Sequence, residues 1–188
     1  MIRIAVIGAG AHSSRYHGPA LRHVAEESPG AVELAAVCDL DVAKADHYAR
    51  EFGFGAVYDE YDAMLEGESP DGLVVITPVA MTREVVADLL PRGIPLLFEK
   101  PPGVNSEEAR ELLAAAEGHD APHMISFNRR FSPAVMKARQ WLAANAADRP
   151  PELAIARMFR VDRRDEDFVT STAIHAADTI LAFMGRPT

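Results

Sequence analysis

A lysine at position 100 ends an apolar run and precedes two prolines, in the segment LLFEKPPG at residues 96–103. If this run is a strand of a parallel sheet, the lysine lies at the edge of the sheet where ligands bind. An ammonium group there stabilises negative charge on a reacting oxygen and favours loss of a proton from a hydroxyl. The alternative is a salt-bridged strand end that takes no part in chemistry.

A glycine-rich segment, GAGAHS, follows the first apolar run of the chain. Gly8 and Gly10 match the start of a dinucleotide-binding fingerprint, in which the first glycine permits a tight turn and the second lets the backbone approach a pyrophosphate. Ser13 stands where a third small residue is expected. The amides at the start of the following helix, around Ala11 and His12, would face the phosphate charge. A glycine turn with no ligand is the alternative.

Asp39 follows the apolar run at residues 32–38. A carboxylate at the end of a second strand can accept both hydroxyls of an adenosine ribose and would repel a 2′-phosphate, which favours NAD over NADP. The separation between Gly8 and Asp39 exceeds the usual spacing of about 20 residues. We therefore expect an extended loop in the first crossover, around residues 28–33. A helix cap is the alternative interpretation of Asp39.

Short β-branched runs alternate with longer helical patterns, which is typical of βαβ units and a parallel sheet. The sequence predicts an α/β fold with a doubly wound parallel Rossmann sheet, followed by the start of an α+β second domain. The expected strands are residues 2–7, 32–38, 56–58, 73–77, 95–99 and 123–127. The expected helices are residues 16–27, 41–52, 59–66, 82–92, 106–117 and 133–146.

The last part of the chain has a different pattern. Residues 146–152, with two prolines, are expected to form a linker, and residues 171–185 an amphipathic helix that ends at a glycine. Between them, residues 151–164 predict one long strand with an apolar face. We expect two domains, a nucleotide-binding domain at 1–128 and a partial catalytic domain at 129–188. The apolar face of the strand would consist of Leu153, Ile155, Phe159 and Val161.

Composition excludes several classes of function. The formal charge is −9, with 28 acidic and 19 basic residues and no block of lysine or arginine, so nucleic acid is not an expected partner. The single cysteine, Cys38, rules out an intramolecular disulfide and a thiolate zinc cluster, and no metal site is expected. With no apolar run of about 18 residues, we expect neither a membrane span nor a signal peptide. A cytoplasmic protein is the simplest interpretation.

Taken together, these segments resemble the glucose-fructose oxidoreductase, inositol dehydrogenase and MocA (Gfo/Idh/MocA) family of NAD(P)-dependent oxidoreductases. The most specific part of the resemblance is the EKP segment that follows a strand ending in TP. The resemblance covers nearly the whole chain. The matching segments are VIGAGAHS, VCDLDVAKADHYAREFG, VVITP, FEKPPGVNSEEARELL, FNRRFSP and IHAADTILAFMGRP.

The resemblance implies hydride transfer between a nicotinamide cofactor and a secondary alcohol or ketone of a sugar or cyclitol-like substrate. Lys100 would orient the substrate, and His175 would serve as general acid and base, with support from Asp178 one turn away. Arg129 and Arg130 could equally be solvated charges. The other implied contacts are Thr77, Pro78, Glu99, Lys100 and Pro101 with the cofactor, and Asn128, Ser171 and Asp178 with the substrate.

Two features depart from the family pattern. Ser171 stands where many relatives carry an aspartate, although it could also be a helix cap. Family members are also considerably longer, because their second domain builds a broad sheet. The departures favour a rival function, a catalytically weak NAD-binding protein with a regulatory or structural role. The chain is expected to be either a fragment or a subunit of a homo-oligomer, whose strand at residues 151–164 pairs with another chain.

Overall fold

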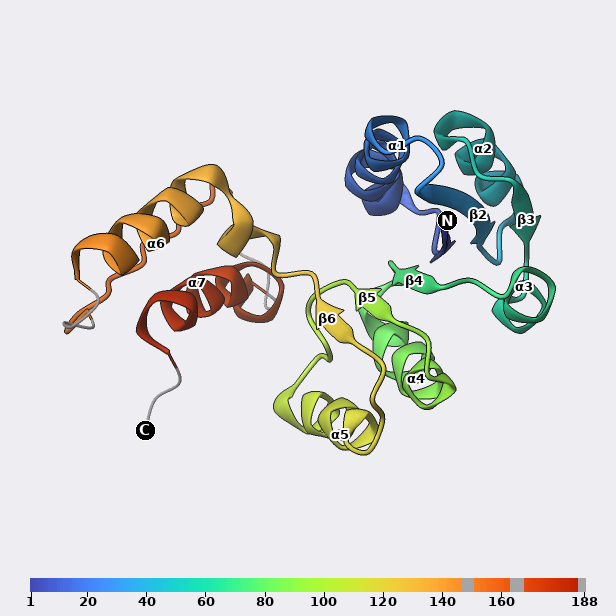
Figure 1. The fold of residues 1–188 in the computed structure, drawn as a ribbon. Helices are drawn as coiled ribbons and strands as arrows, with labels where there is room; N and C mark the ends of the chain where they lie inside the picture. The colour runs from blue at the N-terminus through green and yellow to red at the C-terminus, as the bar shows by residue number, and fades with distance from the viewer. Residues whose placement is uncertain (147–150, 163–167, 186–188) are drawn as a thin grey trace. The chain divides into compact units, whose positions relative to one another are not determined.

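The computed structural model describes residues 1–146, 151–162 and 168–185. The chain divides into two compact units, Met1–Ile125 and Ser126–Thr188 (Figure 1). The sequence predicts this boundary at residue 128. Each unit has its own arrangement of helices, and the first contains the sheet.

The first unit is built on a sheet of six parallel strands. Its order is β3-β2-β1-β4-β5-β6, so the strand order reverses between β1 and β4, where open α/β sheets bind ligands. This confirms the predicted doubly wound fold, although the strands expected at 73–77, 95–99 and 123–127 end earlier. The strands are β1 (Ile2–Ile7), β2 (Val32–Cys38), β3 (Ala56–Tyr58), β4 (Gly72–Val75), β5 (Leu96–Phe98) and β6 (His123–Ile125).

Helices cover both faces of this sheet (Figure 1). Alternate side chains of a strand point to opposite faces, so Ala5 and Ile7 of β1 pack in one layer and Val6 packs in the other. The layer with Ala5 contains α3 (Tyr61–Glu68), α4 (Val79–Leu89) and α5 (Ser106–Ala116). The layer with Val6 contains α1 (Gly18–Glu27) and α2 (Val42–Phe52).

The first crossover is long because its helix is long, and the expected loop around residues 28–33 is wrong. Helical structure runs from residue 11 to residue 27 and includes a π-helical turn at Ser13–His17 directly before α1. Only residues 28–31 then connect to β2. Pro19 explains the wide turn, because a proline ring collides with the carbonyl four residues earlier in a regular α-helix.

The second unit contains two longer helices, α6 (Pro133–Asn145) and α7 (Ile174–Met184). A short 3₁₀ helix at Asn128–Phe131 precedes α6, and a π-helical turn at Val169–Ala173 precedes α7. The buried residues of α7 are polar, namely His175 and Asp178, whereas the apolar Leu181 and Met184 are exposed. None of the helices among the described residues is both long and apolar enough to cross a membrane.

The strand expected at residues 151–164 is wrong. Residues 151–162 form no strand in the structure, and residues 163–164 lie outside the described part of the chain, as do 147–150 of the expected linker. A lone extended segment has no neighbour to complete its backbone hydrogen bonds, so no ladder forms. Its apolar side chains are nonetheless exposed, with exposed fractions of 75% for Leu153, 70% for Ile155, 82% for Phe159 and 87% for Val161.

Candidate nucleotide-binding site

A pocket of about 290 Å³ lies at the carboxyl ends of β1, β2 and β4 in the first unit. It is therefore at the point where the strand order reverses, which is the usual ligand position in this type of sheet. Five of the predicted cofactor residues line it: Gly8, Gly10, Asp39, Thr77 and Pro78.

The two glycines of the fingerprint have different surroundings. Gly8 has a φ of +104°, and a Cβ atom at this position would lie 2.1 Å from the carbonyl oxygen of Ile76. The Gly8 N–H also donates to the carbonyl oxygen of Cys38 at 2.8 Å, which ties the loop to β2. A Cβ atom at Gly10 would meet nothing within 4 Å. The loop is thus closely packed at the first glycine and open to a ligand at the second.

Ser13 is a buried packing residue, which explains why the third fingerprint position tolerates it. Its hydroxyl donates to the hydroxyl oxygen of Tyr48 in α2 at 3.0 Å. Gly18 of α1 also packs tightly against α2, because a Cβ atom at this position would come within 2.5 Å of the Phe52 ring. No local sequence pattern marks Gly18 as a packing residue, because its partner Phe52 lies far along the chain.

Asp39 connects the second strand to the glycine loop. Its Oδ2 accepts a hydrogen bond from the Ala9 N–H at 2.8 Å, and its Oδ1 accepts one from the Asp41 N–H at 2.9 Å. Asp41, whose side chain accepts from the Lys44 N–H, is the cap of α2, so the cap interpretation of Asp39 is wrong. Each carboxylate oxygen has a further lone pair with which to accept a ribose hydroxyl.

Additional charges line the pocket beside Asp39, and the sequence analysis missed them. Asp59 and Glu60 follow β3, whose end pairs with the end of β2. Lys44 also lines the pocket, and its Nζ lies 3.1 Å from Oδ2 of Asp41. Together with Asp39, this makes three carboxylates and one ammonium group at the wall, a negative balance. The pairing of β2 with β3 places Asp59 and Glu60 beside Asp39, and their spacing along the chain does not reveal this proximity.

Cys38 also lines this pocket but is not a reactive group. The residue is buried, and burial together with the charge of neighbouring Asp39 raises the pKa of its thiol to about 11. A thiol with this pKa stays protonated near neutral pH and is a poor nucleophile.

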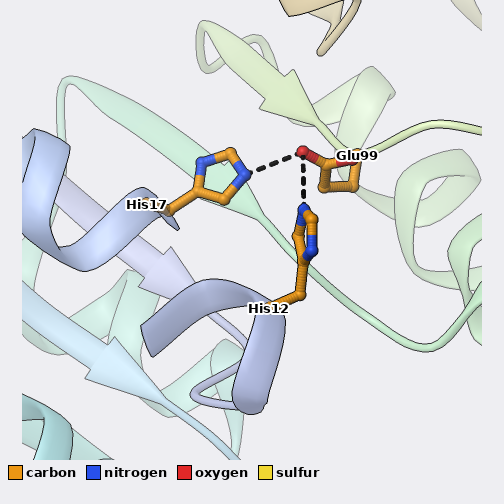
Figure 2. A group of neighbouring side chains, drawn as sticks. All are labelled: His12, His17 and Glu99. Carbon is orange, nitrogen blue, oxygen red and sulfur yellow. Dashed lines mark hydrogen bonds and ion pairs between the residues drawn. The ribbon is translucent and has the colours of Figure 1, made fainter. Parts of the chain in front are cut away.

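The EKP segment follows β5 and places a buried carboxylate beside two histidines. Oε1 of Glu99 lies 2.8 Å from Nε2 of His17 and 3.5 Å from Nε2 of His12 (Figure 2). Oε2 accepts a hydrogen bond from the backbone N–H of Lys100 at 3.1 Å. The carboxylate thus orients the backbone at Lys100, which is half-buried. No local sequence pattern marks His17, because its partner Glu99 lies far along the chain.

The remaining predicted residues of the first unit do not line the pocket. Ala11 is exposed at the start of the long helix, and Pro101 is buried after a cis peptide bond with Lys100. His12, Glu99 and Lys100 are likewise absent from the pocket wall. The structure therefore separates the predicted cofactor residues into a group at the pocket and a group around the EKP segment.

In the second unit, His175 is buried on α7. The Phe127 ring lies nearly perpendicular to its imidazole, with 6.3 Å between the ring centroids. The backbone carbonyl oxygen of His175 accepts a hydrogen bond from Oγ1 of Thr179 at 2.7 Å. His175 lies in the second unit, whereas Lys100 lies in the first.

Asp178 pairs with Arg130, which corrects two expectations. Its Oδ2 accepts from Nε of Arg130 at 3.0 Å, and its Oδ1 accepts from Nη2 of the same guanidinium group. The contact is a bidentate ion pair with a buried carboxylate, and this hydrogen bond raises the pKa of Arg130. Arg130 is therefore not a solvated charge. Asp178 secures the segment before α6 to α7, and the expected contact with His175 is not the one it makes.

Ser171 lies inside the π-helical turn before α7 rather than at its cap. Its Oγ is 3.5 Å from Oγ1 of Thr172, while Phe168 holds the cap position of the turn. The cap interpretation of Ser171 is therefore wrong.

Asn128, the other expected substrate contact, is exposed at the start of the 3₁₀ helix that precedes α6. The adjacent Arg129 is half-buried, and this burial lowers the pKa of its guanidinium group.

Comparison with known proteins identifies the class. Residues 2–127 match the model of the oxidoreductase family with an NAD-binding Rossmann fold. The chain belongs to this Gfo/Idh/MocA family, as the sequence resemblance predicts.

The chain is similar to several named dehydrogenases and related proteins over part of their length. The chain is 36% identical over 143 residues to the rhizopine catabolism protein MocA of Rhizobium meliloti, covering 76% of the chain and 42% of that protein. It is 30% identical over 139 residues to D-glucoside 3-dehydrogenase of Escherichia coli, covering 74% and 38%. The fold matches that of levoglucosan dehydrogenase in complex with NADH and L-sorbose, with a TM-score of 0.78 at 18% identity, covering 99% and 53%. The chain thus spans about half the length of these relatives, or less.

Proposed function

We propose that the protein is an NAD-dependent dehydrogenase that acts on a secondary alcohol or ketone of a sugar or cyclitol. The observation that carries the proposal is the pocket at the reversal of strand order, with the open backbone at Gly10 and the carboxylate of Asp39 on its wall. The relative named D-glucoside 3-dehydrogenase supports the substrate class. The cytoplasmic location stays a prediction.

The residues present fit a dinucleotide. The Gly8–Gly10 loop and the helix that follows it would hold the pyrophosphate, and Asp39 would accept the ribose hydroxyls. When bound, the nicotinamide ring accepts or returns a hydride at its C4 atom. His175 would take the hydroxyl proton of the alcohol or return it to the ketone. The ammonium group of Lys100 would stabilise the charge that develops on that oxygen.

The test is a binding measurement followed by an activity screen. We expect isothermal titration to show saturable binding of NADH, and a set of sugars and cyclitols to include one that reduces NAD⁺. Absence of NADH binding would contradict the assignment of the pocket. Binding with no turnover on any sugar or cyclitol would contradict the proposed activity while leaving the pocket assignment intact.

We expect NADH to bind more tightly than NADPH, because a 2′-phosphate would meet Asp39 on a wall that also carries Asp59 and Glu60. Asp39→Ser should narrow the difference between the two dissociation constants by on the order of tenfold, since one like charge is removed. Asp46→Ser is the control, because Asp46 is a half-exposed residue of α2 that pairs with Arg50 and does not line the pocket. Equal affinities for the two cofactors in the unaltered protein would contradict the prediction.

We also propose that the exposed segment 151–162 is covered by another chain in a homo-oligomer. Four of its five large apolar side chains are at least 70% exposed, an arrangement that favours burial against a partner. We expect light scattering to show a dimer or larger assembly that Phe159→Ser weakens, while Leu113→Ser on the exposed face of α5 does not. A compact monomer whose segment resists limited proteolysis would show that the covering surface lies within the chain itself.

A further inference from the structure

Three potential metal ligands converge beyond the end of β5 in the first unit. The His-Glu cluster consists of His12, His17 and Glu99, and one ligand atom from each lies within 4.8 Å of the others (Figure 2). None of the three lines the nucleotide pocket. The cluster therefore lies outside the pocket wall, although His12 belongs to the helix start whose backbone amides would face the pyrophosphate.

The π-helical turn is what places both histidines at the same carboxylate. In a regular α-helix, with 3.6 residues per turn, residues five positions apart point in different directions. A π-helical turn hydrogen-bonds at a spacing of five, so His12 and His17 lie on the same side. Their ring centroids are 5.8 Å apart, and both Nε2 atoms approach Oε1 of Glu99. Such single wide turns occur frequently at functional sites.

The chemistry and spacing of the cluster suit a transition-metal ion. Two imidazoles and one carboxylate are the protein ligands of many zinc sites that keep a fourth position open. With metal–ligand bonds of about 2.0–2.2 Å, neighbouring ligand atoms of a tetrahedral site lie roughly 3.4 Å apart. The distance from His12 Nε2 to Glu99 Oε1, 3.5 Å, matches this value. The His17 contact, at 2.8 Å, is a hydrogen bond that must lengthen by roughly 0.6 Å when a metal replaces the proton.

A neighbouring backbone amide orients the carboxylate of the cluster, and one of the histidines faces solvent. Oε2 of Glu99 accepts the Lys100 N–H, and a hydrogen bond of this kind orients a ligating carboxylate. The side chains of His17 and Glu99 are 14% and 10% exposed, whereas that of His12 is 50% exposed. Two ligands are thus held inside the fold, and the third faces solvent, where an ion can enter.

From this geometry we infer that His12, His17 and Glu99 form a binding site for a divalent transition-metal ion of the zinc class. The site has three protein ligands and one open position. It departs from the sequence analysis, which expects no metal, because the ligands come from a helix and a strand end that lie far apart in the chain.

The test is titration of the metal-free 188-residue chain with Zn²⁺, followed by Co²⁺ as a spectroscopic probe. We expect one equivalent of Zn²⁺ to bind, and bound Co²⁺ to give the intense visible absorption of a four-coordinate ion. His12→Gln is the main variant, because its exposed side chain contributes least to packing. It should weaken Zn²⁺ binding by at least about tenfold, since even the loss of a residue that only supports a ligand costs that much.

Matched variants decide between metal binding and simple hydrogen bonding. His23→Gln removes an exposed histidine of α1 outside the cluster and should leave Zn²⁺ affinity unchanged. His17→Gln should weaken binding as His12→Gln does, with circular dichroism to confirm that it folds. Unsaturable binding, or equal Zn²⁺ affinity in the unaltered chain and His12→Gln, would overturn the proposal and leave a hydrogen-bonded triad. The experiment needs neither cofactor nor substrate, so its outcome is independent of the proposed dehydrogenase activity.

Discussion

Replacing Lys100 by alanine is expected to lower turnover at least about 100-fold while leaving the NADH dissociation constant within a few-fold of the unaltered protein. The reason is that the ammonium group would stabilise charge that develops only in the transition state, so its loss falls on turnover. Lys100 follows β5 but does not line the pocket to which we assign the dinucleotide. Steady-state kinetics on the substrate found in the screen, with NADH titration, measures both quantities.

Two further variants show whether the effect belongs to this position. Lys137→Ala removes an exposed lysine of α6 and should leave turnover unchanged. Lys100→Arg keeps the charge but changes its geometry, and should restore only part of the activity. An unfolded Lys100→Ala variant would support the structural interpretation, in which the lysine only stabilises a strand end. Normal turnover in a folded Lys100→Ala variant would remove the residue from the chemistry.

Gly8→Ala is expected to destabilise the first unit by more than about 3 kcal/mol and to abolish NADH binding. A positive φ in a non-glycine residue alone costs roughly 1–3 kcal/mol. The added methyl group would also lie 2.1 Å from the carbonyl oxygen of Ile76, a backbone atom that cannot rotate away. The free energy of unfolding in urea, measured by circular dichroism, checks the prediction.

Gly10→Ala is the matched control for this prediction, because it adds the same methyl group two residues away. Nothing lies within 4 Å of the added atom, so the free energy of unfolding should hardly change. The methyl group would nevertheless stand at the pocket wall, where we expect it to weaken NADH binding. If Gly8→Ala were as stable as Gly10→Ala, the close contact between the glycine loop and Ile76 would be wrong.

Local sequence patterns predict much of the first unit. The apolar runs at β1, β2 and β3 have the bounds that the sequence predicts, because strands covered by helices on both faces are apolar along most of their length. The glycine pattern and Asp39 could be placed at one edge because parallel strands end together. Membership of the family could also be predicted, since it depends on short contiguous segments such as EKP.

Contacts between distant segments could not be predicted in this way. Asp178 pairs with Arg130, although spacing along its helix suggested His175, because a guanidinium from another segment offers two hydrogen bonds. Asp59 and Glu60 line the pocket because the end of β3 pairs with the end of β2. Residues 151–162 lack strand structure although their sequence is apolar.

The sequence by itself determined the order of strands and helices in the first unit, the glycine loop and the lysine at the end of β5, because each depends on residues that are close along the chain. Only the tertiary structure decided which side chains meet: Gly18 with Phe52, and His12 and His17 with Glu99. The physical reason is that a strand needs a neighbouring strand to complete its backbone hydrogen bonds, and that a buried charge is costly unless another group pairs with it or hydrogen-bonds to it. Such partners are supplied by chain segments that local pattern does not connect.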